Sequence, residues 1–155
     1  MSENKKRARL WISRLLIAAV TLMNLQAAFL FMLNPQDYAP GFEMSGEAGE
    51  AMMRGMGLLF LMWNIPYIFA LFHPARHFVS LVEAVIMQFI GVTGESLILL
   101  GLPGKHPIIQ ASVRRFIFFD GAGLVVLLAA LLLVIQLKGG SRHKNAIDSK
   151  PGDSA

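Results

Sequence analysis

Two carboxylates interrupt the most apolar part of this chain. Glu95 lies in GVTGESLILLGLP (91–103) and Asp120 lies in RRFIFFDGAGL (114–124), where most neighbours are hydrophobic or glycine. Ionisable side chains inside an apolar helix are costly, and they usually face the protein interior or a wet cavity. A pair of carboxylates in such a place can bind a ligand, carry a proton or act in general acid–base catalysis. The elements that carry Glu95 and Asp120 therefore determine which of these functions is feasible.

Other residue types that do chemistry are absent or scattered. The chain has no cysteine, which excludes disulfides, thiol catalysis and thiolate metal sites. No phosphate-binding glycine loop, HExxH motif or GxSxG motif occurs. His73 and His77 are four residues apart, but they lie in a predicted turn with Pro74 and not on one helix. The sequence therefore indicates no catalytic residue, no metal site and no cofactor. The histidines lie in predicted loops and in the tail: His73, His77, His106 and His143.

The hydrophobic residues form four long blocks. They make up 55% of the 155 residues, against about 45–50% in a typical soluble domain. A helix of about 20 mostly apolar residues crosses a bilayer. The predicted spans are 11–33, 52–72, 78–102 and 116–137, and Pro66 is expected to bend the second of them. We therefore predict an all-α fold, an integral membrane four-helix bundle.

The distribution of Lys and Arg predicts how the spans are oriented. Ten of these 14 residues lie in the N-terminal segment, in the 73–77 turn or in the tail from 138, and four lie on the other side. Because basic residues accumulate on cytoplasmic segments, both termini are predicted to be cytoplasmic. The chain then divides into a basic cytoplasmic arm (1–10), the transmembrane bundle (11–137) and a disordered cytoplasmic tail (138–155).

The spans bring several polar side chains to a similar depth. At about 1.5 Å per residue, Glu95 lies roughly 25 Å from the start of the third span, in its outer half. Asp120 lies near the outer end of the next, antiparallel span. Asn64 of the second span and Gln26 of the first are expected near this depth, and Arg115 lies just above the carboxylates. We therefore predict a polar cavity in which Arg115 is the counter-ion of Glu95, Asp120 is its neighbour, and Asn64 and Gln26 orient a ligand.

A structural interpretation of the same polar groups competes with this one. Buried polar side chains also hold membrane helices together, at about 0.6 kcal/mol per contact. Taken singly, the amides Asn24, Gln26, Asn64 and Gln88 are interpreted as contacts of this kind. For the two carboxylates, packing and function both stay open.

The layout resembles the DoxX-like group of small four-helix membrane proteins. The resemblance rests on SRLLIAAVTLMNLQAAFLFMLNP (13–35) as a first span, then a polar outer loop, then RGMGLLFLMWNIPYIFALFHPAR (54–76) as a second span with a short basic turn. It covers most of residues 10–137. It implies a four-span bundle, and some members of the group are linked to quinone or thiol redox chemistry. This chain has no cysteine for a thiol role.

The leading functional hypothesis is a non-enzymatic multi-pass membrane protein whose outer-half cavity binds or passes a small ligand or proton. One alternative is a structural or accessory subunit of a membrane complex. Another is a membrane enzyme that acts on a lipid, sterol or quinone. The expected partners are the lipid bilayer, a small apolar ligand or quinone, and another membrane protein. Nucleic acid is not expected, because the basic residues follow the span ends. The expected location is the bacterial cytoplasmic membrane.

Overall fold

The computed structural model describes the backbone of residues 3–148 and the side chains of residues 3–137. Within 3–148 every regular element is helical, as predicted for an all-α fold. In chain order the elements are α1 (Glu3–Leu33), α2 (Pro35–Tyr38), the 3-10 helix η1 (Ala39–Phe42), α3 (Gly46–Trp63), α4 (Ile65–Phe72), α5 (Phe78–Gly101) and α6 (Pro107–Asp148).

Four helical segments are long and apolar enough to cross a membrane, which confirms the prediction of four such helices. Large hydrophobic side chains cover their outer surface; Leu33, Leu100 and Phe118, for example, are 74%, 83% and 80% exposed. A water-soluble protein rarely exposes so extensive an apolar surface, so this exterior fits contact with lipid chains. The candidate spans are Glu3–Leu33, Gly46–Phe72, Phe78–Gly101 and Pro107–Leu137.

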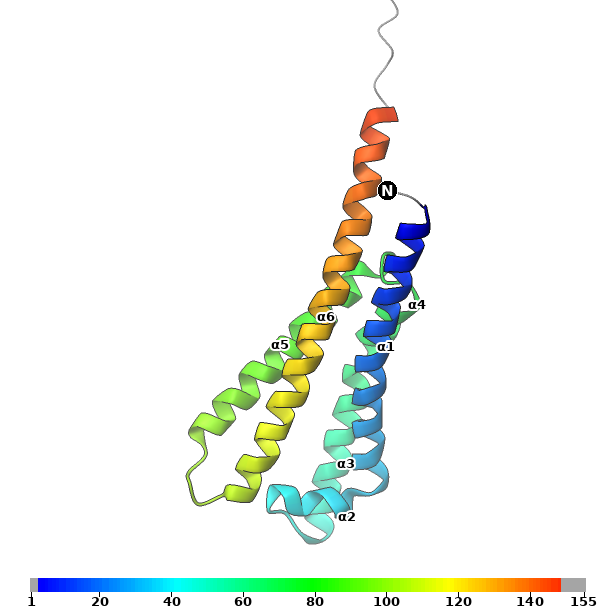
Figure 1. Cartoon of the computed structure of the whole chain (residues 1–155). Helices are drawn as coiled ribbons and strands as arrows, with labels where there is room; N and C mark the ends of the chain where they lie inside the picture. The colour runs from blue at the N-terminus through cyan, green and yellow to red at the C-terminus, as the bar shows by residue number, and fades with distance from the viewer. Residues whose placement is uncertain (1–2, 149–155) are drawn as a thin grey trace, which may run out of the picture.

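The two ends of the described chain lie at the same end of the bundle (Figure 1). We call this the terminal end; the opposite end, which carries α2, η1 and the α5–α6 loop, is the distal end. Helix α5 packs on α6 and α4, whereas α3 packs on α1. Toward the distal end α5 leans away from α3 (Figure 1). The distal halves of α3 and α5 therefore diverge.

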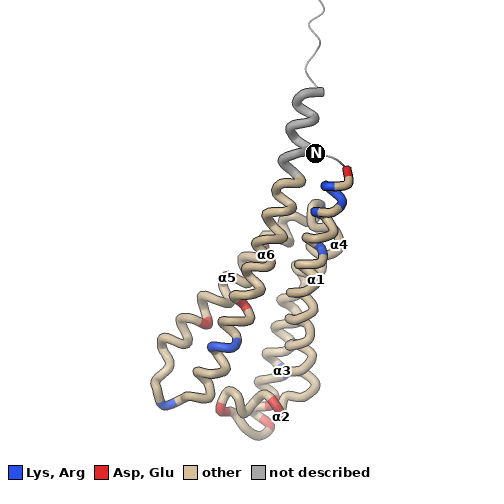
Figure 2. The backbone as a smooth tube through the Cα atoms, viewed as in Figure 1, with Lys and Arg blue, Asp and Glu red and all other residues tan. Residues whose placement is uncertain are grey.

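Charged residues are unevenly distributed along the helices. Figure 2 shows long uncharged stretches in α1 and α3, and it shows charged positions in the distal halves of α5 and α6. The two carboxylates singled out in the sequence, Glu95 and Asp120, lie on α5 and α6 respectively.

The first and last helices extend beyond their predicted spans. Helix α1 begins at Glu3, so the basic arm continues the first span as helix. Helix α6 is continuous from Pro107 to Asp148, and so it covers the first part of the segment predicted as a disordered tail. No proline lies between Pro107 and Pro151, so no residue in between lacks a backbone N–H donor. The remainder of that predicted tail, 149–155, lies outside the described residues.

The second candidate span is divided at Asn64. Pro66 has no backbone N–H and occupies the first turn of α4, a position where this donor is not needed. Helix α3 therefore ends at Trp63, and Asn64 forms the junction between the two helices. The sequence predicted a bend at Pro66; the structure instead has a junction between two helices, two residues before it. As a result, the side chain of Asn64 sits at a helix junction while it is only 1% exposed.

A dry core holds the terminal half of the bundle together, and α1, α4, α5 and α6 all contribute to it. At the terminal end the Arg14 Nε donates a hydrogen bond of 3.1 Å to the Leu71 carbonyl in the last turn of α4. A cation is favourable beside the C-terminus of a helix. The fully buried side chains of this core are Ile17, Tyr67, Ala70, Leu81, Ala84, Leu127, Ala130 and Val134.

Aromatic rings and one glycine shape the distal end. The ring of Phe31 lies 5.8 Å from that of Phe60 and 6.1 Å from that of Phe116, which joins α1, α3 and α6. A Cβ at Gly57 would lie 2.7 Å from the Ala28 carbonyl oxygen. Helices α1 and α3 can therefore approach this closely only because residue 57 carries no side chain.

Candidate functional site

A cavity of about 230 Å³ lies in the distal half, between α1, α3, α5 and α6. This volume is far larger than one water molecule requires, because a single site needs only about 10–15 Å³. The polar residues that line the cavity are Asn24, Asn64, Gln88, Glu95 and Asp120. We call this space the polar cavity.

Asp120 is held in place by a chain of hydrogen bonds. The Gln88 Nε2 donates to Asp120 Oδ1 at 2.9 Å and also lies 3.2 Å from the Asp120 main-chain oxygen. The Tyr67 hydroxyl donates to Gln88 Oε1 at 2.6 Å and lies 3.1 Å from the main-chain oxygen of Ala84. Buried polar groups that are partnered in this way fix the side chains that carry them. The position of Asp120 is therefore set by α4 and α5 as well as by its own helix.

Two glycines make room for this chain of hydrogen bonds. A Cβ at Gly91 would lie 2.5 Å from Asp120 Oδ2, and a Cβ at Gly123 would lie 2.8 Å from Gln88 Nε2. Each glycine thus allows a polar side chain of the facing helix to approach the backbone. Gly94 also lines the polar cavity, but a Cβ there would meet no atom within 4 Å.

Two of the residues that line the polar cavity each have a buried oxygen without a partner in the described chain. Asn64 Nδ2 donates to the Phe60 carbonyl at 2.7 Å, which leaves Asn64 Oδ1 as the acceptor of that side chain. Within the described part of the chain, neither Asn64 Oδ1 nor Glu95 Oε2 has a hydrogen-bond partner. A buried polar atom left unpaired costs about 1–3 kcal/mol. Asn64 and Glu95 therefore each keep an acceptor that no described residue of the bundle satisfies.

The remaining wall of the polar cavity is aromatic and aliphatic. Phe60, Trp63 and Phe119 line it, and the rings of Phe60 and Trp63 meet edge to face at 6.5 Å. Ile90 and Ile98 also line it, although they are 57% and 56% exposed on the outer surface of α5. The cavity thus reaches the apolar exterior beside α5.

Three of the five predicted site residues come together in the polar cavity: Glu95, Asp120 and Asn64. Gln26 does not line it, because its side chain is exposed. Residues 24 and 26 are separated by about 200° around a helix, so only one of them can face the interior. That residue is Asn24, which is 9% exposed.

The predicted pair of Arg115 with Glu95 is not formed among the described residues. Arg115 is exposed, and its guanidinium donates to Ser112 Oγ at 2.9 Å. It lines a second cavity of about 330 Å³ toward the distal end, together with Asp37 and Tyr38. Five residues separate Arg115 from Asp120, which is about 140° around the helix, so the two side chains cannot share one face.

Sequence reasoning missed Tyr67 and Trp63 and interpreted Asn24 and Gln88 as packing contacts. The spacing of seven residues between Gln88 and Glu95 does predict that both lie on nearly the same helix face, and both line the polar cavity. No comparable signal existed for Tyr67, since its partner Gln88 lies on another helix.

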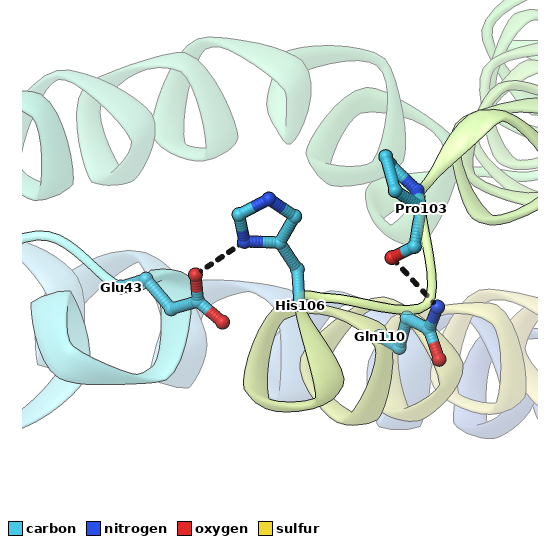
Figure 3. A network of polar contacts seen from close by, with 4 residues as sticks. All are labelled: Glu43, Pro103, His106 and Gln110. Carbon is cyan, nitrogen blue, oxygen red and sulfur yellow. Dashed lines mark hydrogen bonds and ion pairs between the residues drawn. The ribbon is translucent and has the colours of Figure 1, made fainter.

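The distal end is tied by a contact between two loops. The His106 Nδ1 lies 2.6 Å from Glu43 Oε2, and Gln110 Nε2 donates to the Pro103 carbonyl at 3.3 Å (Figure 3). Glu43 has a backbone φ of 56°, which turns the chain from η1 toward α3. The contact of His106 with Glu43 joins the α5–α6 loop to the segment after η1, whereas the bond from Gln110 ties that loop to the start of α6.

No family model matches this chain, and it matches no curated protein and no solved structure. Fold and site together describe a helical bundle with four candidate transmembrane helices and a polar cavity in its distal half. The DoxX-like resemblance stays a prediction.

Proposed function

We propose that this chain is a multi-pass protein of the bacterial cytoplasmic membrane whose polar cavity binds or passes a small ligand or proton. In this proposal both termini are cytoplasmic, and the distal half is the outer half. The observation that carries the proposal is that two residues lining one cavity of about 230 Å³, Asn64 and Glu95, each have a buried oxygen without a partner in the described chain.

Packing alone does not account for these two oxygens. A carboxylate that served only to hold helices together would be expected to have a partner on another helix, as Asp120 has in Gln88. Glu95 Oε2 and Asn64 Oδ1 are instead buried and unpaired within the described chain. A ligand or proton that occupies the cavity would satisfy them and offset the cost of their burial.

The accessory-subunit alternative draws support from the contact between Gln88 and Asp120. Such a contact between helices is what a purely structural polar group makes. Under this alternative the polar cavity has no occupant, and Glu95 has no function.

Access to the polar cavity can be measured through Trp63. The chain has two tryptophans, so Trp11→Phe leaves Trp63 as the only one. Acrylamide, a small neutral quencher, is expected to quench Trp63 in this background. Gly94→Leu should lower the quenching slope, because a side chain at 94 enters the cavity without meeting an atom within 4 Å at its Cβ.

The matched control is Gly121→Leu. A Cβ at 121 likewise meets nothing within 4 Å, and this residue does not line the polar cavity. Equal quenching slopes in the parent, Gly94→Leu and Gly121→Leu would mean that small molecules do not enter the cavity, and the proposed function would fall.

The proposed orientation has its own test. Because the chain has no cysteine, Gly104→Cys in the α5–α6 loop and His73→Cys after α4 each introduce a single thiol. An impermeant maleimide added to intact cells should label the first variant and spare the second. The reverse pattern would place both termini outside.

A further inference from the structure

The polar groups of the cavity restrict what it can hold. Two of its amide donors are already used: Gln88 Nε2 bonds to Asp120, and Asn64 Nδ2 bonds to the Phe60 carbonyl. The Asn24 amide, which can donate and accept, also lines the cavity, but the buried atoms without a partner in the described chain are both oxygens, Asn64 Oδ1 and Glu95 Oε2. No Lys, Arg or His is among the described residues that line it. An occupant that brings hydrogen-bond donors would therefore satisfy both oxygens.

Two kinds of side chain in the cavity would stabilise a positive charge on the ligand. Glu95 and Asp120 supply carboxylates on α5 and α6, and hydrogen bonds between ionised partners are about twice as strong as neutral ones. Phe60, Trp63 and Phe119 supply aromatic faces, which attract a cation placed within about 6 Å of the ring centroid.

The acidic pair alone would not define a site, because carboxylates also occur as packing contacts. Asn64 supplies the independent observation. It is 1% exposed, lines the same cavity from the junction of α3 and α4, and its Oδ1 is unpartnered within the described chain. The Asn64 amide is neutral at every pH, so its oxygen acts as a hydrogen-bond acceptor. An occupant that satisfies this oxygen must bring a donor.

The apolar wall of the polar cavity indicates the chemistry of the remaining part of the ligand. Ile90 and Ile98 line the cavity and are more than half exposed on the apolar exterior. An apolar body can therefore contact this wall and reach the cavity from the lipid side of α5. A quinone fits less well, because its head brings only acceptors and would leave Asn64 Oδ1 and Glu95 Oε2 without a donor.

We propose that the polar cavity binds an amphiphilic amine, a small apolar molecule with a protonated nitrogen that carries N–H donors. Glu95 and Asn64 accept from the nitrogen, Asp120 adds charge, and the rings of Phe60, Trp63 and Phe119 surround it. This inference rests on the proposed function and specifies the class of ligand.

The experiment compares three probes that share one apolar cage: adamantan-1-amine, 1-adamantanol and adamantane-1-carboxylate. Binding is followed by Trp63 fluorescence in the Trp11→Phe protein reconstituted in nanodiscs. The amine is expected to bind at least about tenfold more tightly than the alcohol, and the carboxylate is expected not to bind.

Substitutions test whether the preference for the amine arises in the polar cavity. Glu95→Gln should raise the Kd of the amine by about tenfold while the Kd of the alcohol stays within about twofold. Glu83→Gln is the matched control, since Glu83 is an exposed carboxylate on the same helix that does not line the cavity. It should leave both Kd values unchanged. Asp120→Asn is the second variant if Glu95→Gln fails to fold, and it should weaken the amine selectively.

Two results would contradict the inference and spare the proposed function. One is equal binding of the amine and the alcohol, or tighter binding of the neutral quinone duroquinone, with both lost in Gly94→Leu. The other is no amine binding by a protein whose Trp63 is quenched by acrylamide. If acrylamide does not reach Trp63 either, both the inference and the proposed function fall.

Discussion

The two halves of the bundle differ in what fills their interior. In the terminal half, α1, α4, α5 and α6 converge on aliphatic side chains such as Ile17, Leu81 and Leu127, all of which have no exposed surface. In the distal half, α5 leans away from α3 (Figure 1), and the interior holds a cavity lined by two carboxylates. The terminal half therefore carries stability, whereas the distal half carries polar groups at a cost in stability.

The largest predicted contrast between the halves comes from truncated aliphatic side chains. Leu81→Ala removes a fully buried side chain from the dry core and should cost about 2–5 kcal/mol. Ile98→Ala removes a side chain that is 56% exposed at the polar cavity and should cost less than about 1 kcal/mol. Thermal unfolding in one detergent measures both. Similar losses would show that the distal interior is packed as tightly as the terminal core.

A glycine pair on α5 sharpens the contrast within the distal half. Gly91→Ala places a Cβ 2.5 Å from Asp120 Oδ2. Because Gln88 holds Asp120, the clash should break that hydrogen bond and cost about 1–3 kcal/mol. Gly94→Ala meets no atom within 4 Å and should be neutral or stabilising by up to about 1 kcal/mol. If both variants unfold at the same temperature, the close contact between α5 and α6 at residue 91 is wrong.

A smaller effect is expected at the boundary between the two halves. Tyr67→Phe leaves Gln88 Oε1 without the hydroxyl that donates to it at 2.6 Å, and a loss of about 1–2 kcal/mol follows. Tyr38→Phe is the matched control, since the Tyr38 ring packs on Phe31 at 5.0 Å. Unfolding of the two variants in parallel measures the difference. An equal loss would indicate that the Tyr67 hydroxyl does not support the hydrogen bonds around Asp120.

Much of the fold could be predicted from the sequence, because bilayer thickness and hydrophobic block length constrain each other. The four long apolar helices were predicted in this way. A bend at Pro66 was predicted from its missing N–H, and the structure has a helix junction just before it. The ends of α1 and α6 were not predicted, because a helix that has crossed a membrane can continue into polar sequence until a residue stops it. Hydrophobic composition predicts where the apolar block ends, but it does not predict where the helix ends.

The sequence predicted the depth of the site residues along the helices, but not the direction in which each side chain points. Spacing along a span gives the height of a residue, and Glu95, Asp120 and Asn64 do share one cavity. Height alone could not separate Gln26 from Asn24 or place Arg115 on its own face of α6, because the rotation of a helix is fixed by its neighbours. The hydroxyl of Tyr67 was missed for the same reason, since its partner is on another helix.

The thermal stability of Glu95→Gln in detergent, measured beside wild type and Glu83→Gln, tests whether Glu95 serves the polar cavity or helix packing. Because Glu95 Oε2 has no partner in the described chain, we expect Glu95→Gln to unfold at or above the wild-type temperature. A midpoint well below those of wild type and Glu83→Gln would contradict it and identify Glu95 as a structural contact.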